Sequence, residues 1–237
     1  VMKALEAADI KVVPTGLKHG TVTAIIRSRP FEITTLRRDV ETDGRHARVV
    51  FGRDWKRDAE RRDFTINALY AEADGTVVDL VGGLADLQSR TLRFIGDAEM
   101  RIREDYLRIL RFFRFHAVYG DAAQGIDAEG LAACAAHVDG LAGLSRERIG
   151  AEMRKLLCAA DPAPALASMA GAGVLAAVLP GADPRAIAPL VHVEAGQAPR
   201  WLRRLAVLGG EDPTQALRLS RAETGDFGRI RAEIGSA

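Results

Sequence analysis

Two segments about forty residues apart carry residue types that could bind a nucleotide. Residues 61–69 read RRDFTINAL, and residues 104–115 read EDYLRILRFFRF. In the second segment Asp105 and Arg108 stand three positions apart, a spacing at which side chains on an α-helix are neighbours. A carboxylate accepts a hydrogen bond from an exocyclic amine, whereas a guanidinium donates one to an unprotonated ring nitrogen. The pair could therefore contact one edge of a nucleobase.

Such a pair would accept some bases and reject others. Cytosine and adenine present an amine beside an unprotonated ring nitrogen, whereas uracil and guanine present a carbonyl oxygen beside a protonated one. Mismatched buried polar groups can reject a substrate by on the order of 10⁴-fold. Asp105 and Arg108 could thus select C and A without a nucleic-acid template. The alternative for an isolated Asp-x-x-Arg is an ordinary surface ion pair.

The element expected to position this pair is a helix over residues 101–119. Counted at about 100° per residue, one stripe forms the predicted core seam: Ile102, Tyr106, Ile109 and Phe113. The adjacent stripe holds the candidate binding residues at the edge of a groove: Asp105, Arg108 and Phe112, with Arg111 alongside. Five arginines fall between positions 101 and 114, so the sequence predicts a local basic stripe on a chain whose net charge is only +1.

Residues 10–80 have the pattern of an α+β region with short strands. The β-branched runs are residues 11–13, 21–27, 31–36 and 76–80. We expect residues 21–27 and 31–35 to form a hairpin with a three-residue loop, Ser28-Arg29-Pro30. Alternation along the second arm places Glu32 on the face opposite Phe31 and Ile33.

After Gly82-Gly83 the sequence becomes helical, with amphipathic segments at 101–119, 128–137 and 146–159 and shorter ones to the end. Ser145, Asp161 and Asp183 are predicted helix caps, the last two because a proline follows each of them. Strands followed by helices imply separate units. We expect three domains, at residues 1–95, 96–160 and 161–237.

The ordered motifs resemble the class II tRNA nucleotidyltransferases, the CCA-adding enzymes and bacterial poly(A) polymerases, from about Lys18 to Leu157. The resemblance implies an α+β fold: a partial nucleotidyltransferase head, DNA polymerase β-like with a β-sheet, followed by an all-α neck and body. It makes Asp105 and Arg108 the protein template for incoming CTP and ATP. It assigns Arg111 and Arg114 to nucleotide binding as well; for Arg114 the alternative is a solvent-facing side chain. Residues 61–63 match a second motif, in which Arg62 binds the nucleotide and Asp63 recognises the ribose hydroxyl.

The resemblance also implies Mg²⁺, because nucleotidyl transfer uses divalent ions held by clustered carboxylates. Glu32 is the candidate catalytic and metal-binding carboxylate; the alternative is an exposed strand residue. The family's Gly-Gly-x-x-Arg-Asp loop and Asp-x-Asp pair do not occur in this sequence. We therefore expect the remaining ligands upstream of Val1, with both termini cut and these residues alone inactive.

Two further segments fit the family. Residues 79–83 (DLVGG) match its Asp-x-x-x-Gly segment, which could be a hinge or a plain interdomain turn. Glu147-Arg148-Ile149, with Glu152 and residues 155–157, matches the last motif and resembles a structural brace under the nucleotide helix.

Composition excludes several other classes of protein. Cys134 and Cys158 lie in apolar helical sequence and are predicted to be buried, which fits neither a disulfide framework nor a zinc site. There is no apolar run of roughly 20 residues to span a membrane, and a reducing cytoplasm is expected. The histidines include no His-Asp dipeptide, which disfavours an HD-type phosphohydrolase, and we expect all of them to be structural or exposed: His19, His46, His116, His137 and His192.

We therefore predict a template-independent RNA nucleotidyltransferase that adds CCA to the 3′ acceptor end of tRNA from CTP and ATP. A poly(A) polymerase, or an enzyme limited to CC or A addition, is an alternative within the family. A catalytically dead RNA-binding module that kept the nucleotide pocket is an alternative from a different class. The sequence leaves the oligomeric state open.

Overall fold

The computed structural model describes residues 1–17, 20–43 and 46–235, and it describes their side chains except those of 37–50 and 235. His19 and the side chain of His46, both named above, therefore lie outside the described part. The chain divides into two compact units, Val1–Arg62 and Asp63–Ala237. Each unit is described here by itself.

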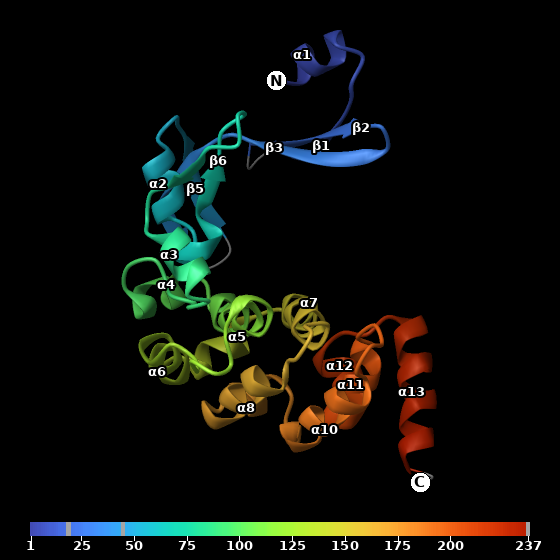
Figure 1. Ribbon diagram of the computed structural model, residues 1–237. Coiled ribbons are helices and arrows are strands. Elements are labelled where there is room, and N and C mark those ends of the chain that lie inside the picture. Colours follow the sequence, from blue (N-terminus) through green and yellow to red (C-terminus); the bar gives the residue numbers. More distant parts are fainter. Residues whose placement is uncertain (18–19, 44–45, 236–237) are drawn as a thin grey trace. The chain divides into compact units, whose positions relative to one another are not determined.

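In its described residues, the first unit contains two antiparallel sheets and two short helices (Figure 1). Its elements in chain order are α1 (Met2–Ala7), β1 (Lys11–Gly16), β2 (Thr21–Ile26), β3 (Arg29–Thr34), β4 (Arg37–Asp43), β5 (His46–Phe51) and α2 (Trp55–Glu60). Strands β1, β2 and β3 form one sheet in that order, and β4 pairs with β5. The predicted strands at 11–13, 21–27 and 31–36 are therefore present, whereas the β4–β5 hairpin was not predicted.

The turn between β2 and β3 is shorter than predicted. Ile26 pairs with Arg29, so the loop consists of Arg27 and Ser28 alone, and both have positive φ angles, 49° and 64°. Two-residue turns of this kind match the twist of the flanking strands, which explains why the hairpin closes tightly. The prediction of a three-residue loop at 28–30 was wrong because neither turn residue is the glycine or asparagine that usually marks such a turn.

The second unit begins with a small mixed region and continues as helices only. The mixed region comprises the 3₁₀ helix η2 (Thr65–Asn67), β6 (Leu69–Ala71), β7 (Val77–Asp79) and α3 (Gly83–Gln88). The helices that follow are α4 (Ala98–Glu104), α5 (Leu107–Tyr119), α6 (Ala128–Ala136), η3 (Val138–Gly143), α7 (Arg146–Leu157), α8 (Ala163–Gly171), α9 (Val174–Val178), η4 (Pro184–Ala186), α10 (Ile187–Val193), α11 (Trp201–Leu208), α12 (Pro213–Ala216) and α13 (Arg221–Gly235). The predicted α+β fold with a helical second half is confirmed.

The predicted helix over residues 101–119 is interrupted. α4 ends at Glu104, Asp105 has an extended backbone (φ −157°, ψ 106°), and α5 starts at Leu107. The predicted core seam holds, since Ile102, Ile109 and Phe113 are fully buried. Phe112, predicted beside the binding residues, is also fully buried and stacks on Phe94. Asp105 and Arg108 therefore do not share the face of one continuous helix.

One hydrophobic core extends through the second unit from Phe64 to Phe227. α5 packs beside α7 and α8 at its centre (Figure 1). Phe64, Leu92 and Phe94 belong to this core, so residues 63–95 pack with the helices. The compact units thus do not coincide with the division into 1–95, 96–160 and 161–237, which stays a prediction about domains.

Smaller predictions had mixed outcomes. Asp183 is the N-cap of η4, and its side chain accepts the backbone N–H of Arg185, as predicted. Asp161 accepts the backbone N–H of Ala163, but the N-cap of α8 is Pro162, so the prediction that Asp161 caps this helix was wrong. Ser145 precedes α7, but its hydroxyl makes no capping hydrogen bond. Cys134 is buried, whereas Cys158 is exposed, so the prediction that both are buried was wrong.

Candidate nucleotide-binding site

Asp105 lies at the break between α4 and α5, and two donors fix its carboxylate. Its Oδ1 accepts a hydrogen bond from the backbone N–H of Leu107 at 3.1 Å, and its Oδ2 accepts one from Nη2 of Arg148 at 2.6 Å. The first contact reaches the backbone of Leu107, the first residue of α5. The second comes from α7, 43 positions further along the chain. Asp105 is thus held by groups from two helices and keeps about a quarter of its side chain exposed, 27%.

Arg108 sits in the first turn of α5 and is held by the preceding helix. Its Nη1 forms an ion pair with Glu104 and donates to the carbonyl oxygen of Arg101 at 2.7 Å. Asp105 and Arg108 thus have separate side-chain partners, Arg148 and Glu104. The expectation that the two residues share one helix face was wrong, because Asp105 precedes the helix that carries Arg108.

Arg101 connects this region to Asp63. Its guanidinium pairs with Glu104 at 2.8 Å. Burial lowers the pKa of Arg101 and the charge of Arg108 lowers it further, whereas Glu104 and Asp63 act in the opposite direction. Arg101, Glu104 and Arg108 therefore form one charged cluster at the junction of α4 and α5.

Asp63 is buried, and both of its carboxylate oxygens have partners. Oδ2 accepts Nε of Arg111 at 2.5 Å, and Oδ1 accepts the side-chain amide of Asn67 at 2.8 Å and the backbone N–H of Phe64 at 3.0 Å. Burial by itself would raise the pKa of Asp63, but Arg111, Asn67 and Phe64 outweigh it, so the pKa lies below its usual value of 3.8. The predicted ribose-recognition residue is thus an anchored carboxylate.

Arg114 faces inward rather than toward solvent. Its Nε lies 2.6 Å from Oε2 of the buried Glu152 on α7, and its guanidinium stacks 4.3 Å from the centre of the Phe115 ring. Arg111 approaches the same ring at 5.3 Å. A cation over an aromatic face is attracted by the ring's quadrupole. The solvent-facing alternative for Arg114 is therefore excluded, and α7 makes ion pairs with both Asp105 and Arg114, which is the geometry of a brace.

Arg62 and Glu32 belong to the first unit. Nη2 of Arg62 lies 3.3 Å from Oδ2 of the buried Asp58. Glu32 pairs across the sheet with Thr23, and its side chain is exposed on the face it shares with hydrogen-bonded threonines. The prediction that Glu32 lies on a strand is confirmed, and its catalytic role stays a prediction.

Glu32 does not by itself form a metal site of the expected kind. Two-ion catalysis needs several carboxylates around the ions. Among the residues whose side chains the structure describes, no group of three or more His, Cys, Asp or Glu residues could hold a metal ion. The described residues therefore do not by themselves form the carboxylate cluster that two-ion catalysis uses.

Asp79 organises the Gly-Gly turn before α3. Its carboxylate accepts four backbone N–H groups, those of Val81, Gly82, Gly83 and Leu84, at 2.9 to 3.1 Å. Desolvation by itself would raise the pKa of Asp79, but the four backbone N–H donors have the larger effect, so the pKa of Asp79 is lowered. Gly82 has φ 81°, a left-handed conformation that suits glycine. The hinge role stays a hypothesis.

Three residues around the site were not predicted as binding residues: Arg101, Glu104 and Arg148. Glu104 and Arg148 belong to sequence motifs that match the family, so the sequence could have marked both as residues of the site. Their pairing was not visible in the sequence, because a contact across 43 positions depends on how α7 packs on α5. Nothing in the sequence marked Arg101 as a residue of the site except its place in the predicted basic stripe.

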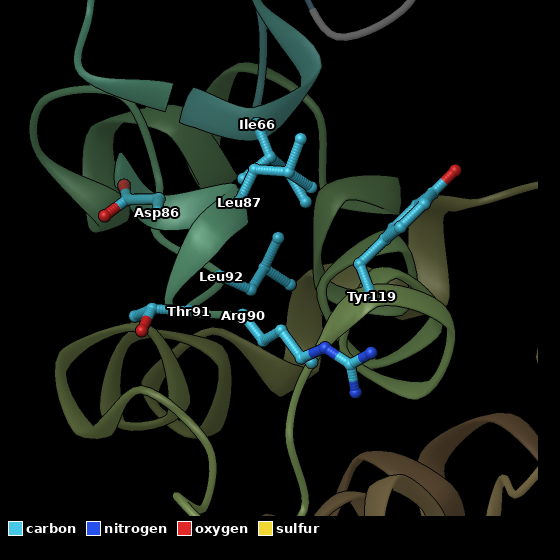
Figure 2. A pocket seen from close by; sticks show the side chains of 8 residues that line it. Ile66, Asp86, Leu87, Arg90, Thr91, Leu92 and Tyr119 are labelled. Atoms are coloured by element: carbon cyan, nitrogen blue, oxygen red, sulfur yellow. The ribbon is translucent and has the colours of Figure 1, made fainter. Parts of the chain in front are cut away.

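A pocket elsewhere in the second unit contains none of the predicted residues. Figure 2 shows it between α3 and the end of α5, where Ile66, Leu87 and Leu92 line it and Tyr119 and Arg90 flank one side. A larger cavity of about 500 Å³ lies where α7 begins, beside Pro180 and α12. Neither is the candidate site, which is a cluster of ion pairs and not an enclosed cavity.

Two protein-family models match the chain. The one described as "Poly A polymerase head domain" matches residues 1–93, and the one described as "Probable RNA and SrmB- binding site of polymerase A" matches residues 125–185. Together they cover more than half of the chain. Glu32, Arg62 and Asp63 lie within the first match.

Relatives with curated names match as well. The chain is 51% identical over 153 residues to "CCA tRNA nucleotidyltransferase 1, mitochondrial" of Mus musculus, a match that covers 64% of this chain and 35% of that protein. It is 37% identical over 198 residues to "CCA-adding enzyme" of Geobacillus thermodenitrificans, covering 83% of this chain and 45% of that protein. The chain thus spans less than half the length of these relatives.

A solved structure matches nearly the whole chain. The Bacillus stearothermophilus CCA-adding enzyme in complex with CTP superposes with a TM-score of 0.76 at 30% sequence identity. The match covers 96% of this chain and 57% of that one. The likeness includes the helices beyond residue 157, where the sequence matched only in general character.

Proposed function

We propose that the natural protein that carries this chain adds CCA to tRNA 3′ ends, because the chain belongs to the family of CCA-adding tRNA nucleotidyltransferases and poly(A) polymerases. CTP and ATP are the proposed nucleotide substrates, and the tRNA 3′ acceptor end is the proposed primer. Because the chain spans only part of each relative, the activity is proposed for the natural protein that carries this sequence.

One observation carries the proposal: Asp105 and Arg108 flank the start of α5, and each is fixed by its own partner. Leu107 and Arg148 hold the carboxylate, and Glu104 and the Arg101 carbonyl hold the guanidinium. Side chains fixed before the ligand arrives discriminate better than mobile ones, because their cost of ordering has already been met. A fixed acceptor beside a fixed donor fits the amine and ring nitrogen of C and A.

The remaining assignments concern the sugar and the phosphates. A carboxylate has about four acceptor positions, so Asp63 can accept a ribose hydroxyl while it keeps Arg111, Asn67 and Phe64. We assign Arg62, Arg111 and Arg114 to the nucleotide, because guanidinium groups bind phosphate oxygens through paired donors. Binding of phosphate would compete with the carboxylate partners that Arg111 and Arg114 have in the free protein.

Mg²⁺ is the proposed cofactor, with Glu32 as one oxygen ligand. Such an ion would neutralise the triphosphate and activate the primer hydroxyl when bound. Glu32 is exposed and lies in the head-domain match, which supports the assignment.

A poly(A) polymerase is the second candidate, because the family model over residues 1–93 carries that description. The names of the relatives quoted above favour CCA addition. An RNA-binding module without catalysis would keep the base-reading pair yet transfer nothing. The three candidates therefore differ in what they add to the same tRNA when CTP and ATP are supplied: CCA, a run of A, or nothing.

The test is nucleotide transfer by the natural protein to tRNA that lacks its CCA end. CCA addition predicts two C residues from labelled CTP and one terminal A from ATP. A variable run of A with no C incorporation would identify a poly(A) polymerase. Binding of CTP and ATP without transfer of either nucleotide, with Mg²⁺ present, would contradict an enzyme of either kind.

No helix in the part of the chain that the structure describes has the length and apolarity to cross a membrane. Cytoplasmic location stays a prediction, and the mouse relative quoted above carries a mitochondrial name.

A further inference from the structure

Asp105 depends on another helix for its orientation. Its backbone is extended, so the regular geometry of α4 and α5 does not fix its side chain. Leu107 holds Oδ1 through a backbone N–H in the same turn, and Arg148 holds Oδ2 from α7. The plane of the carboxylate is therefore defined by two donors that approach its two oxygens separately.

α7 is itself firmly placed against its neighbours. Ile149, Met153 and Leu157 are buried in the core. A Cβ added to Gly150 would lie 2.0 Å from the carbonyl oxygen of Leu217, so the helix and that backbone are in direct contact. Glu152 on α7 forms another ion pair, to Arg114 on α5. Arg148 thus extends from a fixed base.

The chemistry of base selection makes this contact important. A carboxylate with about four acceptor positions keeps about two for a ligand after Leu107 and Arg148 are satisfied. Which direction those positions face depends on the angle of the carboxylate plane. A planar, forked guanidinium fixes that plane better than the point charge of a lysine.

The two base-reading residues have independent supports. Arg108 is held from within its own segment, by Glu104 and the Arg101 carbonyl. Asp105 is held from α7. Loss of the α7 contact should therefore disturb the acceptor and leave the donor in place.

We propose that Arg148 is a positioning residue that determines base selectivity by orienting the Asp105 carboxylate toward the exocyclic amine of the incoming nucleotide. This inference rests on the proposed function. It predicts that changes at Arg148 alter the choice between C and U more than the rate of transfer, and that they do so only while Asp105 is present.

The test is a double-mutant cycle on the natural protein, measured as kcat/KM for CTP and for UTP. Arg148→Gln is expected to lower the preference for CTP on the order of tenfold, within the usual size of coupling between contacting residues. In an Asp105→Ala background the same change should lower the preference no further. Arg218→Gln is the matched control, because it removes an exposed ion pair to Glu147, the neighbour of Arg148, and should leave the preference unchanged.

The outcomes separate this inference from the proposed function. Suppose that Asp105→Ala relaxes base choice. If Arg148→Gln then lowers kcat/KM for CTP and UTP equally, or if its effect on the preference for CTP adds in full to that of Asp105→Ala, Arg148 has only a structural role and the inference is wrong. If Asp105→Ala itself leaves base choice unchanged, the proposed template fails and the inference fails with it. Should Arg148→Gln not fold, Arg148→Lys carries the same prediction at a smaller size, about threefold.

Discussion

Nε of Arg111 lies 2.5 Å from Oδ2 of Asp63, although 48 positions separate the two residues in the chain. This ion pair ties the first residue of the second unit to the middle of α5. Both residues are assigned to the nucleotide, so in the free protein two parts of the candidate site neutralise each other. A bound triphosphate would have to compete with Asp63 for Arg111.

The first prediction concerns the stability of that pair. Arg111→Gln leaves the buried Asp63 without its cation, and we expect the free energy of unfolding at pH 7 to fall by about 2–4 kcal/mol. Urea unfolding followed by circular dichroism measures it. Arg103→Gln is the control, because it removes an exposed pair with Glu99 and should change stability by less than about 1 kcal/mol.

The pH dependence of the same pair has a definite sign. The pKa of Asp63 in the folded protein is lowered from 3.8, so its contribution is present above that value and is lost as the pH falls through the folded pKa. The stability difference between the wild type and Arg111→Gln should therefore shrink in acid. A difference that stays constant from about pH 7 to about pH 2 would contradict this account of Asp63.

A second prediction concerns base choice. Asp105→Ala in the natural protein removes the acceptor for the exocyclic amine, while Arg108 stays in place. We expect the preference for CTP over UTP to fall by more than the rate of transfer with CTP. Kinetics with all four nucleotides on tRNA lacking CCA measure both quantities. An unchanged preference for C and A over U and G would exclude Asp105 from base selection.

Sequence patterns were sufficient for the buried face of α4 and α5 but not for the break between them. Ile102, Ile109 and Phe113 repeat at helical spacing, and burial of apolar side chains follows that repeat. The break at Asp105 occurs without proline or glycine. An aspartate can cap a new helix wherever the preceding one ends, and a single sequence does not say where that is.

In the candidate site too, the sequence predicted one feature and not another: the types of the residues, but not their partners. The residue types of the nucleotide motifs were recognisable, because Asp and Arg at those positions suit a base and a phosphate. Their partners were not, since Arg148 reaches Asp105 across 43 positions and Arg111 reaches Asp63 across 48. Such pairs depend on the packing of α5 against its neighbours, which no local pattern encodes.

A third prediction separates two adjacent glycines. A Cβ at Gly83 would lie 2.1 Å from the carbonyl oxygen of Thr65, whereas one at Gly82 would meet open space but adopt φ 81°. We expect Gly83→Ala to cost about 2–4 kcal/mol through the backbone clash and Gly82→Ala about 1 kcal/mol through its conformation. Thermal unfolding of both variants tests the order, and equal losses would contradict the close contact at Thr65.

The last prediction concerns Arg204, which is only 2% exposed. Its guanidinium donates to the carboxylate of Glu194 and to the carbonyl oxygens of Leu157, the last residue of α7, and Ala159, just past that end. Arg204→Met leaves the buried Glu194 with only the more exposed Arg203 and leaves these carbonyl oxygens without their donor. We therefore expect it to lower the free energy of unfolding by about 3–5 kcal/mol.

The double variant Arg204→Met with Glu194→Gln should recover part of that loss, because it also removes the buried carboxylate charge that has lost one of its two cationic partners. Arg203→Met serves as the control, since Arg203 pairs with the same Glu194 from a more exposed position and should cost less. Urea unfolding of the four proteins measures these differences. If Arg204→Met proved no more costly than Arg203→Met, the carbonyl contacts at the end of α7 would contribute little to holding that helix, and with it Arg148, in place.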